Sequence, residues 1–150
     1  MNATRNRAVV VGGGVMGGGI AAMFVGGGWH TDVVSRSAST RDALPGVVER
    51  CLKAMGKPTD LSKVKTYATL AEVPWSDVGI VVETVTEDLA LKRRIFAELE
   101  TLAPAGIPLT SNSSSFPISK IGEGLASQSR MMGLHFFMPA HLVPLVEVVR

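Results

Sequence analysis

Apolar positions along the chain fall into two kinds of run, one short and continuous, the other longer and periodic. The short runs are rich in β-branched residues and have the length of strands buried on both faces of a parallel sheet. The longer runs repeat apolar residues every three or four positions, as Leu91, Ile95, Leu99 and Leu102 do. That spacing is typical of a helix with one buried face.

The order of the two kinds of run predicts the fold class. The expected strands are residues 7–11, 30–37, 65–69, 77–85, 107–114, 130–137 and 143–149. The expected helices are residues 15–25, 40–55, 87–103 and 118–125, with Pro45 disturbing the start of the second. Strands that alternate with helices predict an α/β fold with a doubly wound, mostly parallel sheet and helices on both faces. The length fits a single domain, 1–150.

The first strand and helix lie in an unusual stretch, Val9 to Gly28, which has nine glycines and no charge in twenty residues. Its length would suit a membrane span, and Arg5 with Arg7 before it would suit a secretory signal. Glycine inside a helix costs about 1 kcal/mol relative to alanine, which disfavours one continuous apolar helix. The residues that follow also read as a second strand. We therefore interpret the stretch as strand, turn and helix.

The turn of this stretch has the spacing G-x-G-x-x-G at Gly12, Gly14 and Gly17. In a dinucleotide site the first glycine makes a tight turn, the second lets backbone approach a pyrophosphate, and the third allows close packing of helix on strand. The anion would lie on the N–H groups of the helix that begins near Val15 and Met16. The alternative is a glycine-rich turn with a purely structural role. A strand before and a helix after favour a Rossmann-type site for a nicotinamide dinucleotide.

The end of the second strand bears on which dinucleotide binds. A site for NAD usually has Asp or Glu there, which holds the ribose hydroxyls. This chain has Ser35 and Arg36 instead. A guanidinium can pair with a 2′-phosphate, so the sequence predicts NAD or NADP with a preference for NADP. The alternative is that Arg36 is a solvated surface charge.

Composition narrows the partners and the compartment. The net charge is only +2, and the 15 Lys and Arg residues are scattered along the chain, so we expect no nucleic-acid partner. Cys51 is the single cysteine, which excludes an internal disulfide and suits a reducing, cytoplasmic location. The Cys and His residues lack the spacing of metal ligands, so we expect no metal. Because we interpret Val9 to Gly28 as strand, turn and helix, we also expect no membrane partner.

Two residues near the end of the chain suit acid–base chemistry. His135 ends one expected strand, and Glu147 lies in the next, twelve positions later. The chain can turn back over that length and bring the carboxylate to the imidazole. Such a carboxylate fixes the tautomer of a histidine that takes a proton from a hydroxyl. The alternatives are a packed histidine and a surface glutamate.

Four motifs in order make the sequence similar to a known family over practically all 150 residues. They are VVVGGGVMGGGIA, VVETVTEDLALK, SNSSSFPIS and GLHFFMPAHLVPLVEVV. The sequence resembles the NAD-binding domain of the L-3-hydroxyacyl-CoA dehydrogenases, including 3-hydroxybutyryl-CoA dehydrogenases. The resemblance implies an oxidoreductase of fatty-acid or hydroxybutyrate metabolism, with reversible hydride transfer between the nicotinamide and C3 of a 3-hydroxyacyl-CoA.

The resemblance also implies roles for individual residues. His135 would be the general acid and base, Glu147 its orienting carboxylate, and Ser114 a hydrogen-bond donor to the 3-oxygen of the substrate. Asn112 would lie near the cofactor, with Glu87 and Lys92 at its nicotinamide end. As alternatives, Glu87 caps a helix, Lys92 is a solvated helix charge, and the serines only form a turn.

The chain departs from the family in ways that bear on its function. The family commonly has Asn where this chain has Met138, which cannot make the hydrogen bonds of an amide. Family members continue beyond the position of Arg150 into a helical second domain that completes catalysis and forms a homodimer. We therefore expect a chain that is incomplete for catalysis alone and that exposes apolar residues near 142–149. A non-catalytic dinucleotide-binding module and a dehydrogenase of a free hydroxy acid, such as a sugar acid or carnitine, remain as alternatives.

Overall fold

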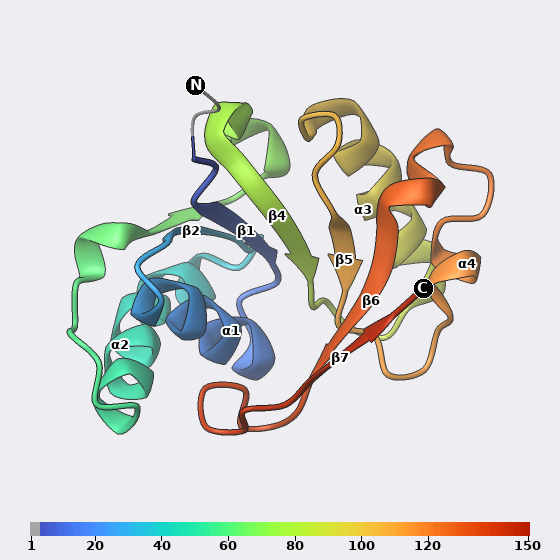
Figure 1. Cartoon of the computed structure of the whole chain (residues 1–150). Coiled ribbons are helices and arrows are strands. Elements are labelled where there is room, and N and C mark those ends of the chain that lie inside the picture. The colour runs from blue at the N-terminus through green and yellow to red at the C-terminus, as the bar shows by residue number, and fades with distance from the viewer. Residues whose placement is uncertain (1–3) are drawn as a thin grey trace.

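The computed structural model describes residues 4–150, which fold into a seven-stranded sheet with helices on both faces (Figure 1). The strands are β1 (Arg7–Val11), β2 (His30–Val34), β3 (Val64–Tyr67), β4 (Val78–Glu83), β5 (Leu109–Ser111), β6 (Met131–Phe136) and β7 (Val146–Val149). The α-helices are α1 (Val15–Gly26), α2 (Ala38–Ala54), α3 (Leu89–Leu102) and α4 (Ile118–Ile121).

The order of strands across the sheet is β3-β2-β1-β4-β5-β6-β7. Neighbouring strands from β3 to β6 are parallel, and β7 alone runs antiparallel, against β6. The chain turns from β1 outward to β2 and β3, then returns across β1 to β4. In such sheets a ligand binds at that reversal, in the crevice beyond the carboxyl ends of β1 and β4. The predicted doubly wound, mostly parallel α/β fold is confirmed.

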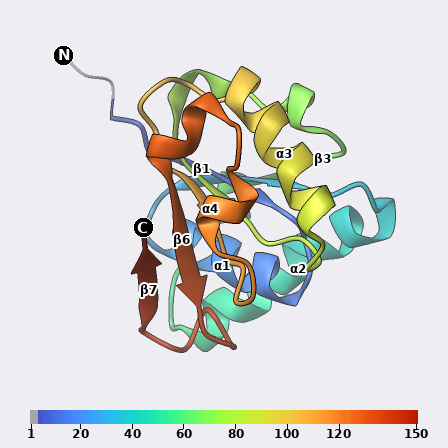
Figure 2. The same cartoon turned by 90° about the vertical axis from the view of Figure 1, so that its right-hand side faces the viewer.

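Two apolar cores lie on opposite faces of the sheet, which Figure 2 shows from the side. Successive residues of a strand point to opposite faces, so Val9 and Val11 pack on one side and Val10 on the other. The first face is covered by α3 and α4, and the second by α1 and α2. Both faces of the central strands are therefore buried, which explains their continuous apolar sequence.

Several predicted element boundaries were wrong. The second strand ends at Val34, three residues early, because the chain turns after Ser35 into α2, whose N-cap is Ser37. Pro45 does not disturb the start of α2, which begins seven residues before it at Ala38 and runs through the proline. The strand expected at 107–114 shrinks to the three residues of β5, and the helix expected at 118–125 to the four of α4. Serines and glycines in these segments form turns instead.

The glycine-rich stretch from Val9 to Gly28 forms the predicted strand, turn and helix. Its helix, α1, covers 12 residues. Within residues 4–150, none of the helices is both long enough and apolar enough to cross a membrane.

Candidate dinucleotide site and acid–base pair

The glycine loop between β1 and α1 is held in a shape that needs glycine at two positions. Gly12 has φ of +110°, and a Cβ there would lie 2.9 Å from the carbonyl oxygen of Thr84. At Gly17 an added Cβ would lie only 1.9 Å from the carbonyl oxygen of Gly12. Gly12 thus makes the tight turn, and Gly17 lets α1 pack onto it, as the motif predicts.

Gly14 differs, because an added Cβ would meet nothing within 4 Å among the described residues. It precedes α1 as its N-cap, with an extended backbone and without a side chain that could bind the first N–H groups. The first turn of α1 contains no acidic residue, again within the described part of the chain. The N–H groups at Val15 and Met16 have no partner within the helix, so this end of α1 suits a pyrophosphate.

A hollow of about 690 Å³ opens at the carboxyl ends of β1, β2 and β4, beside the glycine loop. We call it the strand-end hollow. Its volume lies in the range of small-molecule and cofactor sites, and it sits at the topological reversal of the sheet. Its lining comes from the glycine loop, the ends of β1 and β2, the loops after β3 and β4, and α3: Val11, Gly12, Gly14, Val34–Ser37, Ala68–Leu70, Thr84–Thr86, Leu91, Arg94, Ile95 and Glu98.

Ser35 and Arg36 both line the strand-end hollow, directly after β2. The backbone there is fixed from two sides. Ser35 donates its N–H to the carbonyl of Tyr67 at 3.0 Å, and Arg41 donates from Nη1 to the carbonyls of Ser35 at 2.7 Å and Arg36 at 2.9 Å. The side chain of Arg36 stays exposed. The exposed guanidinium of Arg36 makes no hydrogen bond or ion pair within residues 4–150, and it stands on an anchored turn where the ribose of a dinucleotide would lie.

A second hollow of about 510 Å³ lies on the other side of the glycine loop, between α1, α2 and residues 138–141. It shares Gly14 with the strand-end hollow. Cys51 lines it as a free thiol, and burial raises the pKa of that thiol. Met138 lines the same hollow and is 69 % exposed.

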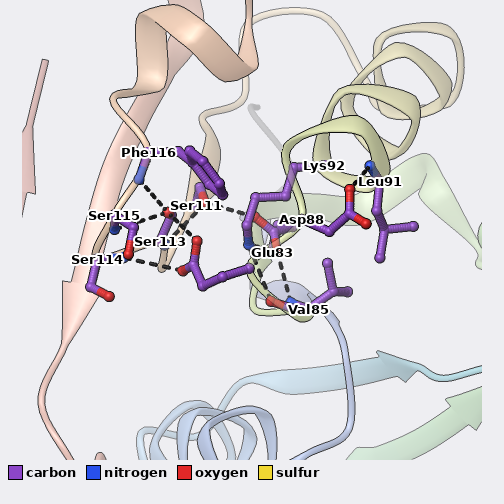
Figure 3. A network of polar contacts seen from close by, with 11 residues as sticks. Glu83, Val85, Asp88, Leu91, Lys92, Ser111, Ser113, Ser114, Ser115 and Phe116 are labelled. Carbon is purple, nitrogen blue, oxygen red and sulfur yellow. Dashed lines mark hydrogen bonds and ion pairs between the residues drawn. The ribbon is translucent and has the colours of Figure 1, made fainter.

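The serine turn after β5, which we define as residues 111–115, is held by two carboxylates (Figure 3). Glu87 accepts hydrogen bonds from the hydroxyl of Ser113 at 2.8 Å and from the N–H of Ser114 at 3.3 Å. Among the described residues the hydroxyl of Ser114 has no partner in the protein, and Figure 3 shows it directed away from the network. It is therefore free to bind a ligand oxygen.

The second carboxylate is Glu83, the last residue of β4, and it is fully buried. Its Oε1 accepts from the N–H of Val85 and from Nζ of Lys92, both at 2.7 Å, and its Oε2 accepts from the hydroxyl of Ser111 at 2.6 Å. Lys92 is also fully buried, and its Nζ donates a further hydrogen bond to the carbonyl of Val85 at 3.1 Å.

Two alternatives for this segment were wrong. Lys92 is not a solvated helix charge, because its side chain has no exposed surface. Glu87 is not the cap of the helix: α3 begins at Leu89, and Asp88 is its N-cap, accepting from the N–H of Leu91 at 2.9 Å. Glu87 is instead turned toward the serines, as described above.

His135 and Glu147 lie opposite each other on β6 and β7, where they form a register pair. Nδ1 of His135 is 3.0 Å from Oε2 of Glu147, so the predicted return of the chain does bring the carboxylate to the imidazole. The ring of His135 also packs at a tilt against Phe137, with 4.8 Å between the ring centroids. The imidazole is 27 % exposed. The second ring nitrogen, Nε2, is left to exchange a proton with a ligand.

Asn112 joins the serine turn to this pair. Its side-chain oxygen accepts from the N–H of Phe136 at 2.8 Å, directly after His135, and its own N–H donates to the carbonyl of Glu83 at 2.8 Å. The serine turn, the end of β4 and the end of β6 are therefore fixed to one another. The predicted site residues come from the glycine loop and the start of α1, the ends of β2 and β6, the segments after β4 and β5, the first turn of α3 and, for Glu147, the amino end of the antiparallel β7.

Sequence reasoning missed three residues of the site. Glu83 accepts a hydrogen bond from Ser111, the first residue of the serine turn, and Arg41 fixes the backbone of Ser35 and Arg36. A signal for Glu83 was present, because it is an acid that ends an otherwise apolar strand. Within residues 4–150, no group of three or more His, Cys, Asp or Glu side chains has the arrangement of a metal site.

Comparison with known proteins agrees with the geometry of the site. The family described as "3-hydroxyacyl-CoA dehydrogenase, NAD binding domain" matches residues 7–150. A glyoxysomal fatty acid beta-oxidation multifunctional protein of Brassica napus is 37 % identical over 152 residues, which cover 97 % of this chain and 21 % of the relative. A probable 3-hydroxyacyl-CoA dehydrogenase of Caenorhabditis elegans is 30 % identical, over 97 % of this chain and 51 % of the relative.

Solved structures give the same result. The crystal structure of Mycobacterium tuberculosis FadB2 has a TM-score of 0.86 and 35 % identity, over 97 % of this chain and 54 % of that one. The 3-hydroxybutyryl-CoA dehydrogenase of Escherichia coli also has a TM-score of 0.86, with 29 % identity over 95 % of this chain and 32 % of that one. This chain thus spans from about a fifth to about half of the length of these proteins. It belongs to the family of NAD-binding domains of 3-hydroxyacyl-CoA dehydrogenases, so its dinucleotide site is one for NAD or NADP.

Proposed function

We propose that this chain supplies the dinucleotide site and the acid–base residues for reversible oxidation of a 3-hydroxyacyl-CoA to a 3-oxoacyl-CoA. The observation that carries the proposal is the contact of His135 with Glu147, fixed beside the serine turn by the hydrogen bond from Phe136 to Asn112. The relatives that match the chain are fatty-acid oxidation proteins and 3-hydroxyacyl-CoA dehydrogenases, which favours this reaction over a non-catalytic module or a free hydroxy acid as substrate.

The residues of the chain divide the work in a simple way. A bound nicotinamide dinucleotide supplies the hydride acceptor or donor. In the oxidising direction Nε2 of His135 takes the proton of the substrate hydroxyl, while Glu147 holds Nδ1 and stabilises the charge that the ring gains. The unpaired hydroxyl of Ser114 binds the same oxygen and orients it. General acid–base help of this kind is worth about 10²- to 10⁴-fold, or roughly 3 to 5 kcal/mol.

Replacing His135 by Ala tests the acid–base role. In a fusion of this chain to the second domain of a family member, we expect reduction of acetoacetyl-CoA with NADH or NADPH to slow by about 10²-fold or more, because the imidazole is lost. Calorimetric affinity for the dinucleotide should stay within a few-fold. His30→Ala is the matched control, since His30 begins β2 at the opposite end of the sheet and should leave the rate unchanged. A wild-type rate in His135→Ala would exclude the proposed role.

For the cofactor we propose a preference for NADP over NAD. Its support is the exposed guanidinium of Arg36 on the anchored turn after β2, with Ser35 in the place of the usual acid. The 2′-phosphate would pair with Arg36, and a charged hydrogen bond of this kind contributes about 1.5 to 3 kcal/mol.

Arg36→Asp tests this preference. The ratio of NADPH affinity to NADH affinity, measured by calorimetry at one salt concentration, should fall by about ten- to a hundredfold. Lys120→Asp makes the same change of charge on α4, away from the strand-end hollow, and should leave the ratio as it is. An unchanged ratio in Arg36→Asp would reject the preference.

We also propose that the protein forms a homodimer and that it works in a reducing, cytoplasmic location. The resemblance to a dimeric family supports the first, and multi-angle light scattering tests it. The free, buried thiol of Cys51 supports the second, and imaging of a fluorescently labelled chain in its host cell tests it.

A further inference from the structure

The strand-end hollow belongs to the adenosine half of the dinucleotide site. Ser35 and Arg36, where the ribose of that half would lie, form one side of the hollow beside the glycine loop. His135 and the serine turn, which would face the nicotinamide, are not among the described residues that line it. The adenine base, which is attached to this ribose, therefore belongs in the hollow.

The hollow has apolar walls that suit the flat ring of adenine. Small-molecule sites are lined mostly by apolar side chains, with a few polar groups that fix the orientation of the ligand. The larger apolar side chains around this hollow are Val11, Val34, Leu70, Val85, Leu91 and Ile95. A ring that lies on such a wall turns its other face toward the mouth of the hollow, where a further side chain can cover it.

One side of α3 borders the hollow and carries an arginine. Four residues of the helix line the hollow, spaced by one, three or four positions, so that they share one side: Leu91, Arg94, Ile95 and Glu98. Arg94 is exposed, and within residues 4–150 it makes no hydrogen bond or ion pair, including with Glu98 one turn further along. Its guanidinium is therefore free to lie over a ring that rests on Leu91 and Ile95.

The preceding residue, Arg93, has different surroundings. Its Nε donates a hydrogen bond to the carbonyl of Lys120 at 2.8 Å, and its Nη2 forms an ion pair with Glu123. These contacts hold Arg93 to α4 and to the segment after it. Two successive arginines of α3 therefore differ, because one is occupied by the protein and the other lines the hollow without a partner in residues 4–150.

We propose that Arg94 binds the adenine base of the dinucleotide by stacking its guanidinium on the face of the ring that the apolar wall leaves open. A guanidinium is planar and more weakly hydrated than an ammonium, so it stacks well on aromatic rings. Arg94 acts on the base, whereas Arg36 acts on the 2′-phosphate. The inference rests on the proposed dinucleotide site and adds to it a residue that recognises the base of NAD and NADP alike.

The experiment measures the affinities for NADH, NADPH and ADP-ribose by calorimetry on the full chain at one salt concentration. All three ligands contain adenine, and ADP-ribose lacks the nicotinamide. Arg94→Ala should lower all three affinities by a common factor of about five to twenty, the scale of a desolvated cation–π contact. A fall in the ratio of NADPH to NADH affinity would assign Arg94 to the 2′-phosphate, and an unchanged affinity for ADP-ribose would assign it to the nicotinamide half. Either result would overturn the inference.

Two further variants separate the flat shape of the guanidinium from its charge. Arg94→Tyr keeps a flat group without the charge, and its affinities should stay within about threefold of wild type, because bases stack on aromatic side chains. Arg94→Lys keeps the charge without the flat group and should bind the ligands less tightly than Arg94→Tyr. The reverse order would indicate a general attraction to the phosphates of the ligand and would contradict stacking.

Arg93→Ala is the matched control, because it removes the same side chain from the neighbouring position of α3. It should leave all three affinities unchanged, and a loss equal to that in Arg94→Ala would refute a specific role of Arg94. Wild-type protein that binds none of the three ligands would overturn the proposed function itself, and the inference with it. Wild type and Arg94→Ala that bind them equally well would overturn the inference alone.

Discussion

Single residues in this site are defined more by what surrounds them than by their type. Gly14 and Gly17 belong to the same motif, yet a Cβ at Gly17 would strike the backbone of Gly12, whereas one at Gly14 would meet only open space. The first limit comes from the fold. At Gly14 the fold leaves room for a side chain, so only a ligand that approaches this residue would require glycine there. Gly17 is therefore a structural glycine and Gly14 a candidate binding one.

Substitution of each glycine by alanine should therefore give opposite results. Gly17→Ala should cost about 3 kcal/mol or more in free energy of unfolding, because the clash is with backbone that must move. Gly14→Ala should cost within about 1 kcal/mol, the scale of a changed N-cap, yet lower dinucleotide affinity by about tenfold or more. Urea unfolding and calorimetry measure the two effects. Undiminished affinity in Gly14→Ala would show that no ligand approaches this residue.

Elements position the site through their ends. The strands stop where the polar residues begin, and the turns that follow are tied to one another by side chains instead of by the sheet. The loop after β3 is an example: Glu72 accepts from the N–H groups of Ala68 and Thr69 at 3.0 and 2.8 Å, and from the hydroxyl of Thr69 at 3.1 Å. Ala68 and Thr69 line the strand-end hollow, so this carboxylate shapes one wall of it.

Low pH should weaken the hydrogen bonds by which Glu72 holds the loop after β3. The hydrogen bonds from Thr69 and Ala68 hold the pKa of Glu72 below its usual value of 4.5. A carboxyl whose pKa is depressed on folding stabilises the protein above its unfolded pKa, and the stabilisation is lost as the pH falls through the folded pKa. Wild type should therefore have a higher Tm than Glu72→Gln near neutral pH, and the difference in Tm should vanish once the pH falls below the lowered pKa of Glu72. A difference that persists in acid would contradict this account.

The sequence predicted the elements well where a local pattern of residues determines the backbone conformation. Continuous apolar runs gave β1, β4 and β6, and the glycine spacing gave the turn before α1. It failed where tertiary contacts decided, as at Pro45, which α2 accommodates because the helix packs its apolar face on the sheet. The Glu83–Lys92 contact was also hidden, because it joins a strand end to a helix across a loop whose path no periodicity specifies.

At the scale of the whole molecule, the edge of the domain formed by β7 and the segment before it exposes apolar side chains. Four apolar side chains in and before β7 are more than half exposed: Leu142, Leu145, Val148 and Val149. The exposed apolar surface expected near residues 142–149 is thus confirmed. Scattered apolar residues on a surface are ordinary, but several within eight positions form a patch that favours association.

Self-association should follow from this patch. Light scattering should show an apparent mass that rises with protein concentration, and Leu145→Ser/Val148→Thr should reduce that rise, since each apolar side chain contributes about 1.5 to 3 kcal/mol when buried. Sulfate strengthens apolar contacts and should increase the association of the wild type. A rise in mass that sulfate suppresses would indicate charge pairing instead.

The place of β7 in the sheet has a consequence for how the domain would fail. β7 is an edge strand that pairs with β6 alone, yet it carries the carboxylate that orients His135. Edge elements with few neighbours open at a much smaller free-energy cost than the central sheet. Gentle warming would therefore release the imidazole while the glycine loop, anchored on β1 at the middle of the sheet, still grips the dinucleotide. On the proposed function, proton transfer would therefore be lost on warming before cofactor binding, although both would depend on the same domain.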